Sequence, residues 1–284
     1  MEIDTSYTIH NTFQKEIKKF PNISIAYANS IINLSETKDL IFKELNNQKL
    51  HLDFYRVKNN ELVPAVILIH GGGWKSGNKS HMEPLAKSIA SQGYACFAVE
   101  YRLSAQAIYP AGINDVKHAI KFIRANATKF GVDSTKIAVL GCSSGGQMAA
   151  LIGTKNNEDY SSTKVQAIIN IDGILAFKHP QSRENVVASK WLGGTCKEKP
   201  KVWEEASALN HTNAQTPPIL FINSQYDRFH AGRDDMIKIL KKHNIYYNLK
   251  TILNSPHTFW LFNPYFKETT KHIVTFLDNQ FKPN

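Results

Sequence analysis

The chain has 284 residues, of which 42% are hydrophobic and 20% are charged, a balance that excludes a disordered or collagen-like protein. Its 34 Lys and Arg residues against 24 Asp and Glu give a formal net charge of +10. No run of about five or six like charges occurs, so we expect a scattered basic surface and no nucleic-acid partner.

The three cysteines have no metal-ligand spacing, so we expect neither a disulfide framework nor a metal site. No stretch approaches the roughly 18 apolar residues of a membrane span. The N-terminal segment is polar and has no apolar signal core. We therefore expect a cytoplasmic protein if Met1 is the native start, and a secreted or periplasmic one if a signal peptide has been removed.

The predicted elements begin after an N-terminal extension, residues 1–38. Two apolar stretches, residues 40–45 and 50–57, are separated by the polar sequence Asn46-Asn47-Gln48-Lys49. This pattern predicts an antiparallel hairpin that leads into the main sheet.

Short continuous apolar runs then alternate with helical periodicity. The runs, each typical of a strand buried on both faces, cover residues 64–70, 95–99, 137–140, 165–171 and 219–222, with a more mixed one at 245–253. The helical patterns cover residues 81–92, 113–127, 145–153, 231–243 and 265–281. Alternation of this kind predicts the α/β class, with a mostly parallel central sheet and helices on both faces.

Glycines and prolines break this alternation between residues 173 and 209. We interpret that segment as an insertion, a possible lid on the substrate side, within a single domain that covers residues 1–284.

The clearest chemical motif is Gly141-Cys142-Ser143-Ser144-Gly145, which follows one predicted strand and opens the next predicted helix. A Gly-x-Ser-x-Gly sequence in this position forms a tight turn that exposes a strained serine. Ser143 is therefore the predicted nucleophile.

A serine hydroxyl needs a base to become a nucleophile. In the chain order serine, acid, histidine, the base follows the last strand, and His257 lies just past the predicted strand at 245–253. The other late histidines, His230, His243 and His272, fall within predicted helices or at their ends. His257 is the predicted base.

Two aspartates could orient that base. Asp227 follows the predicted strand at 219–222, at the sheet edge where active sites of open α/β sheets collect. Asp172 also ends a predicted strand, in Asn170-Ile171-Asp172, and is a competitor. We favour Asp227 because the segment after Asp172 has the pattern of the insertion.

The developing oxyanion needs preorganised N–H donors. The amide of Ser144, at the start of the helix after the nucleophile, is one expected donor. Gly72 and Gly73, in the glycine loop after the strand at 64–70, are the others, with the Trp74 amide as a further possibility. His70, which precedes the loop, is expected to hold it through hydrogen bonds.

Several motifs can be read together with Ser143, Asp227 and His257. They are His70-Gly71-Gly72-Gly73-Trp74, Glu100-Tyr101-Arg102-Leu103, Tyr109-Pro110-Ala111 with Asp115, Gly141-Cys142-Ser143-Ser144-Gly145-Gly146, and His257-Thr258-Phe259-Trp260. In these motifs the chain resembles the α/β-hydrolase superfamily, and within it the hormone-sensitive-lipase-like esterases, from about residue 40 to the C-terminus.

The chain departs from the commonest pattern of that branch. The branch has Asp and Ala where this chain has Cys142 and Ser144, and Gly where it has Thr258. The Ser-Ser-Gly-Gly turn and the sequence around His257 are more similar to bacterial acetylxylan and feruloyl esterases.

The resemblance implies an α/β-hydrolase fold and a serine esterase that works through Ser143, His257 and Asp227 without a metal or organic cofactor. It also implies removal of acetyl or feruloyl groups from plant-type, xylan-like polysaccharide fragments, so the expected partner is an acylated carbohydrate or another small ester. Trp74, Trp191 and Trp260 are candidates for stacking on a sugar or feruloyl ring, with core packing as the alternative. A general short-chain carboxylesterase or lipase-like enzyme, and a kynurenine-formamidase-like amidase, remain open. The sequence does not indicate an oligomeric state.

Overall fold

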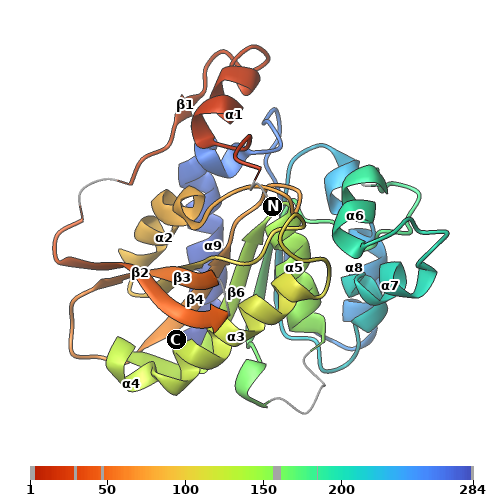
Figure 1. Cartoon of the computed structure of the whole chain (residues 1–284). Helices are drawn as coiled ribbons and strands as arrows, with labels where there is room; N and C mark the ends of the chain where they lie inside the picture. Colours follow the sequence, from red (N-terminus) through yellow and green to blue (C-terminus); the bar gives the residue numbers. More distant parts are fainter. Residues whose placement is uncertain (1–3, 29–30, 46–47, 156–160, 184, 283–284) are drawn as a thin grey trace.

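A computed structural model describes residues 4–28, 31–45, 48–155, 161–183 and 185–282. An eight-stranded sheet forms the centre of the molecule (Figure 1). Its strands in spatial order are β2 (Leu34–Leu45), β3 (Gln48–Val57), β5 (Ala95–Val99), β4 (Val63–Ile69), β6 (Val132–Cys142), β7 (Ala167–Ile171), β8 (Ile219–Asn223) and β9 (Tyr247–Thr251). The pairs β2–β3 and β3–β5 are antiparallel, and all other pairs in this sheet are parallel. The predicted hairpin and mostly parallel sheet are therefore confirmed, although residues 46 and 47 of the predicted turn lie outside the described residues.

Helices cover both faces of the sheet, as predicted. One face carries α2 (Glu83–Ala90) and α9 (Tyr265–Phe281), and the other carries α3 (Ala111–Ala125), α5 (Ser144–Thr154) and α8 (Arg233–Lys242). Two short elements complete this part of the chain, the 3₁₀ turn η1 (Lys79–Met82) before α2 and the helix α4 (Ala127–Phe130) after α3.

Strand β4 shows why its sequence is a continuous apolar run. Ala65, Ile67 and Ile69 belong to the core on the α3 and α5 side. Val66 and Leu68 belong to the core on the α2 and α9 side. Successive side chains of a strand point to opposite faces, so a strand covered by helices on both sides needs apolar residues throughout.

The predicted insertion lies between β7 and β8 and contains two helices and a 3₁₀ turn. They are α6 (Asn185–Leu192), α7 (Pro200–Glu205) and η3 (Ala208–His211), and Figure 1 shows α6 and α7 together beside the α5 and α8 side of the sheet. Trp191 of α6 is buried and stacks on Trp74, which follows β4, with a centroid distance of 4.9 Å. The insertion is therefore packed onto the domain at its base.

The N-terminal extension also forms secondary structure, for which the sequence pattern gave no prediction. Thr8 caps the helix α1 (Ile9–Glu16) by accepting a hydrogen bond from the Asn11 amide at 3.0 Å. The short strand β1 (Ser24–Ile25) pairs antiparallel with β10 (Phe262–Asn263), which directly precedes α9. This pairing fastens the beginning of the chain to the segment that follows the predicted catalytic histidine.

None of the helices in the described ranges is both long and apolar enough to span a bilayer.

Candidate active site

The turn between β6 and α5 holds Ser143 in an unusual backbone conformation. Its φ is 54° and its ψ is −121°, a combination that an L-residue adopts only under strain. The flanking glycines are needed for this turn: a Cβ on Gly141 would lie 2.0 Å from the carbonyl oxygen of Gly145, and a Cβ on Gly145 would lie 2.2 Å from a backbone oxygen of β4. Ser143 therefore sits on the strained strand-to-helix turn that the sequence predicted.

His257 bridges Ser143 and Asp172. Its Nε2 lies 2.9 Å from Ser143 Oγ, and its Nδ1 lies 2.9 Å from Asp172 Oδ2. A carboxylate can only accept, so Nδ1 donates to Asp172 and Nε2 is left to accept the serine hydroxyl proton. The three groups therefore have the order of contacts of a Ser–His–Asp triad.

The structure corrects the choice of acid, because Asp172 and not Asp227 contacts His257. The side chain of Asp227 is 74% exposed, and its Oδ1 lies 3.8 Å from His230 Nε2. Asp172 is 1% exposed and also accepts hydrogen bonds from the amide of Ser224 at 2.8 Å and from its hydroxyl at 2.5 Å. These bonds fix the carboxylate in one orientation toward His257.

Strand register explains this arrangement. Cys142, the last residue of β6, is paired with Ile171, the last residue of the neighbouring β7. The residues that follow them, Ser143 and Asp172, therefore emerge side by side, and the Ser143 amide donates to the Ile171 carbonyl at 2.8 Å. Asp227 lies in η4 (Asp227–His230), four residues past the end of β8, where the chain has already turned toward solvent.

Two aromatic residues hold the ring of His257. Phe229 stacks on it with a centroid distance of 3.4 Å and an interplanar angle of 12°. Trp260 meets it edge-on at 5.4 Å. Phe229 was not among the predicted site residues, because its place two residues after Asp227 in an irregular segment offers no periodic signal that could identify it.

The glycine loop after β4 has the conformation expected of an oxyanion loop. Gly72 and Gly73 have φ of 126° and 61°, and a Cβ on Gly72 would lie 2.1 Å from the Ser76 carbonyl oxygen. Within the described residues, the amides of Gly72, Gly73 and Ser144 donate to no other backbone group. Among the described residues these amides therefore have no competing backbone acceptor, and their role as oxyanion donors stays a prediction.

Trp74 and Gln147 tie this loop to the nucleophile helix. The Trp74 indole N–H donates to Gln147 Oε1 at 3.0 Å, and Gln147 Nε2 donates to the Ala206 carbonyl at 2.8 Å. Gln147 lies in α5, so one buried side chain links the oxyanion loop, the helix after Ser143 and the insertion.

His70 lies beneath the loop and contacts it as expected. Its Nδ1 donates to the Gly71 carbonyl at 2.8 Å, and its ring stacks on Tyr101 with a centroid distance of 4.4 Å. Burial lowers the pKa of His70 to about 3, and burial also lowers the pKa of the nearby His81 to about 4. Both rings are therefore neutral in the folded protein at pH 7.

This burial predicts a loss of stability in weak acid. The unfolded chain takes up protons on these two histidines near pH 6.5, whereas the folded chain does not. Their contribution to the free energy of unfolding is therefore complete above pH 6.5 and declines as the pH falls toward 4. We expect the free energy of unfolding, measured in urea, to fall by roughly 1–3 kcal/mol between pH 6 and pH 5.

The control for this pH dependence is the variant His70→Asn, which keeps an N–H donor near the Gly71 carbonyl. Its free energy of unfolding should depend less steeply on pH over the same interval. An equal pH dependence of the free energy of unfolding in the two proteins would show that His70 is not responsible for the loss of stability.

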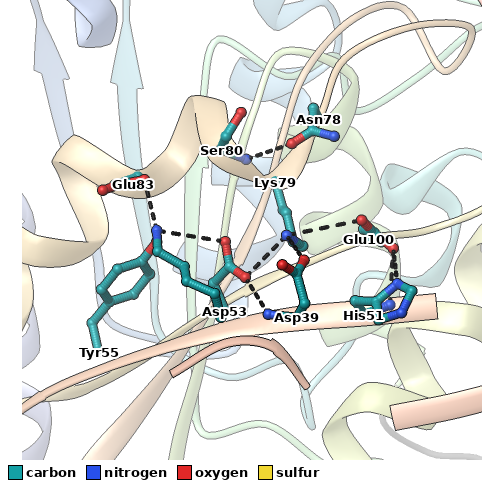
Figure 2. Close-up of polar contacts among 10 residues, drawn as sticks. Asp39, His51, Asp53, Tyr55, Asn78, Lys79, Ser80, Glu83 and Glu100 are labelled. Atoms are coloured by element: carbon teal, nitrogen blue, oxygen red, sulfur yellow. Dashed lines mark hydrogen bonds and ion pairs between the residues drawn. The ribbon is translucent and has the colours of Figure 1, made fainter. Parts of the chain in front are cut away.

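A buried ion network holds the far end of the glycine loop. Figure 2 shows Lys79, two residues after Gly77, between three carboxylates. Its Nζ lies 2.9 Å from Asp53, 2.7 Å from Asp39 and 4.0 Å from Glu100. The network joins η1 to the β2–β3 hairpin and to the end of β5.

Removal of the Lys79 charge should destabilise the fold. In Lys79→Met the carboxylate of Asp53, which is 2% exposed, would keep only Lys38 as a cation, at 3.8 Å. An uncompensated buried charge costs about 3–5 kcal/mol, and we expect a loss of about 3 kcal/mol in the free energy of urea unfolding. Lys58→Met, at an exposed position, is the control and should change it by less than about 0.5 kcal/mol. A loss below about 1 kcal/mol in Lys79→Met would show that the network does not stabilise the loop.

Two cavities meet at Ser143. The larger, of about 760 Å³, is open and contains His257 and Thr258 in its wall, together with residues of α1 and Val187 of the insertion. The smaller, of about 40 Å³, is lined by Gly73, Trp74, Ser143, Ser144, Asp172, Ile174 and Phe229. The site therefore offers a wide space on the His257 side and a small one beside the oxyanion loop.

The structure places all three candidate substrate-binding tryptophans in the core, and Trp74 is 2% exposed. Trp191 is 0% exposed and stacks on Trp74 with a centroid distance of 4.9 Å, and Trp260 is 2% exposed and packs against His257 and Phe259. Neither lines either cavity at Ser143. Core packing, the alternative to ligand stacking, therefore applies to all three, and Trp74 also forms part of the small cavity's wall.

The sheet order, the strained serine and its contacts with His257 define a protein of the α/β-hydrolase class. Within that class the chain belongs to the BD-FAE family, whose model matches residues 52–234. The match includes the oxyanion loop, Ser143 and Asp172, and ends before His257.

Sequence relatives are esterases of greater length. Esterase LipC of Mycobacterium tuberculosis is 32% identical over 220 residues, which are 72% of this chain and 53% of LipC. The probable carboxylic ester hydrolase LipM of the same organism is 28% identical over 62% of this chain and 45% of its own. The chain thus spans about half the length of the curated relatives it matches.

Solved structures share the fold. A truncated carbohydrate esterase from gut microbiota has a TM-score of 0.74 at 21% identity and covers 89% of this chain and 99% of its own. An acetyl ester-xyloside bifunctional hydrolase from Caldicellulosiruptor lactoaceticus has a TM-score of 0.71 at 22% identity, with 90% and 97% coverage.

Proposed function

We propose that the protein is a serine carboxylic-ester hydrolase that removes acetyl groups from carbohydrate fragments. The observation that carries the esterase assignment is the position of His257 between Ser143 Oγ and Asp172, each 2.9 Å away. In this proposal His257 Nε2 takes the hydroxyl proton as Ser143 Oγ attacks the ester carbonyl. The amides of Gly72, Gly73 and Ser144 bind the oxyanion, and His257 then returns the proton to the departing alcohol.

Water completes the reaction in the second half. His257 Nε2 accepts a proton from a water molecule as the water oxygen attacks the acetyl carbonyl bonded to Ser143 Oγ. The acid is released when this bond breaks, and Ser143 recovers its hydroxyl proton from His257. Asp172 keeps the imidazole in the required tautomer and stabilises its transient positive charge.

The two cavities favour a small acyl group. The departing alcohol must receive its proton from His257, which lines the larger cavity and not the smaller one. The acyl chain is therefore placed in the smaller cavity, whose 40 Å³ is enough for roughly one or two methyl-sized groups. An acetyl group fits this space, and a feruloyl group exceeds it.

A carbohydrate as the alcohol part is supported by the wide cavity of about 760 Å³ and by the names of two structures that share the fold, a carbohydrate esterase and an acetyl ester-xyloside hydrolase. Cavities of a few hundred Å³ or more are the usual size for ligands larger than a single small alcohol.

Acetate release from acetylated xylo-oligosaccharides tests this function, with Ser143→Ala as the blank. We expect release by the wild-type protein and none above background by the variant. Efficient hydrolysis of simple short-chain esters without release from any acetylated saccharide would replace the carbohydrate assignment by a general carboxylesterase. Turnover of N-formylkynurenine in preference to all esters would replace it by a formamidase.

A further inference from the structure

The wall of the large cavity is strongly basic. Four of its residues are cations, Lys15, Lys19, Lys75 and Arg228, and only one, Glu16, is an anion. Three of these five come from α1 or the residues just after it, and Arg228 comes from η4. A cavity lined mainly by one sign of charge concentrates ligands of the opposite sign.

Two of the cations are already paired, and two are available. Lys75 Nζ lies 2.7 Å from Asp4, and Lys15 Nζ lies 3.6 Å from Glu16. Lys19 and Arg228 have no carboxylate within ion-pair distance in the parts of the chain that the structure describes. Asp227 precedes Arg228 but does not line the cavity, and among the described residues it forms no ion pair with Arg228 within 4.0 Å.

Arg228 is positioned close to the catalytic base. Its guanidinium carbon lies 4.2 Å from the centroid of the Phe229 ring, and that ring stacks on His257 at 3.4 Å. The guanidinium and the imidazole of His257 therefore both pack on the Phe229 ring, and both groups line the large cavity. An anionic group on the alcohol would meet this cation while its ester lies at Ser143.

We propose that the site prefers esters whose alcohol part carries a carboxylate, with Arg228 and Lys19 as the groups that bind it. An acetylated sugar next to a uronate has this chemistry, and so does a small acidic alcohol. The inference rests on the proposed ester hydrolysis at Ser143 and adds the charge of the substrate to it.

A matched pair of acetate esters provides the test. The probes are 4-acetoxybenzoate and 4-acetoxybenzamide, which share the acyl group and ring and differ in charge. We expect kcat/KM to be about 3–10-fold higher for the carboxylate at low ionic strength, and the ratio to approach one in 1 M NaCl because salt screens exposed charges.

The double variant Lys19→Gln/Arg228→Gln should lower this ratio to about one, since both carboxylate-binding cations are lost. The control is Lys129→Gln/Lys242→Gln, which removes the same total charge from exposed positions in α4 and α8 and should keep the wild-type ratio. Because the result is the ratio of the two kcat/KM values of one protein, a general change in activity or in the folded fraction affects both values equally and cancels.

A second comparison uses acetylated xylo-oligosaccharides with and without glucuronate branches as substrates. A preference for the branched set as well as for 4-acetoxybenzoate identifies a sugar uronate, and a preference confined to the small ester identifies a small acidic alcohol. Hydrolysis of both small esters at a wild-type ratio near one would overturn the charge preference and leave the esterase function standing. Hydrolysis of neither would overturn both.

Discussion

Asp172→Asn should lower kcat for 4-nitrophenyl acetate by about 10⁴-fold, as expected when the acid of a serine triad is replaced by an amide. The amide of Asn would present a donor or a weak acceptor to His257 Nδ1, where Asp172 Oδ2 now accepts at 2.9 Å. The imidazole would lose the tautomer that leaves Nε2 free to take the Ser143 proton. Steady-state kinetics on the purified variant, with its thermal unfolding as a check on folding, measures the loss.

Asp227→Asn is the matched control, because it makes the same chemical change at a side chain that is 74% exposed and does not contact His257. We expect its kcat to stay within about twofold of the wild type. A severe loss in Asp227→Asn together with near-normal turnover in Asp172→Asn would show that Asp227 is the acid in solution and that the observed contact is not the catalytic one.

Acyl chain length should have the second large effect. The wild-type protein is expected to hydrolyse 4-nitrophenyl acetate with a kcat/KM about 10–200-fold higher than the butyrate, because each added methylene must fit a cavity of about 40 Å³. Ile174 lines that cavity and is 4% exposed, so Ile174→Ala should enlarge it and raise the butyrate-to-acetate ratio by about tenfold.

Leu62→Ala controls for the loss of apolar volume as such, since Leu62 is 65% exposed and lines neither cavity at Ser143. Its butyrate-to-acetate ratio should equal that of the wild type. If the wild-type protein accepts acetate, butyrate and ferulate esters equally well, the acyl chain does not occupy the small cavity, and the acetyl assignment fails.

The parts of the fold with strong local patterns were predictable from the sequence. The apolar runs of β4, β5 and β6 mark strands buried on both faces, and the Gly-x-Ser-x-Gly turn fixes Ser143 at the end of one of them. The conformation of the glycine loop was predictable for a similar reason, because glycines after a buried strand permit the positive φ that Gly72 and Gly73 adopt.

The acid could not be chosen by such patterns, because its position depends on pairing between strands. Asp172 and Asp227 both follow buried strands, and only the register of β6 against β7 brings Asp172 beside Ser143. The rule that would have favoured Asp172 is its place directly after its strand, as Ser143 is directly after β6, whereas Asp227 lies further along the chain.

The surroundings of three aromatic residues were also not predictable from the sequence, because they depend on tertiary contacts. Trp191 and Trp260 were candidates for ligand stacking because tryptophan is common in such sites, but a large apolar ring is equally suited to the core, and both rings are buried there. Conversely, Phe229 belongs to the site through its stacking on His257, a contact between segments that are distant in the sequence.

The pairing of β1 with β10 anchors a part of the large cavity's wall that lies outside the stretch matched by the family model. The stretch shared with the family, residues 52–234, contains Ser143, Asp172 and the oxyanion loop. Helix α1, which forms part of the wall of the large cavity, lies before that stretch. The strand β1 that follows α1 pairs with β10, which lies after the stretch. Because the wall of the large cavity includes residues of α1, a comparison of alcohol preference within the family should include residues 4–26 as well as the shared core.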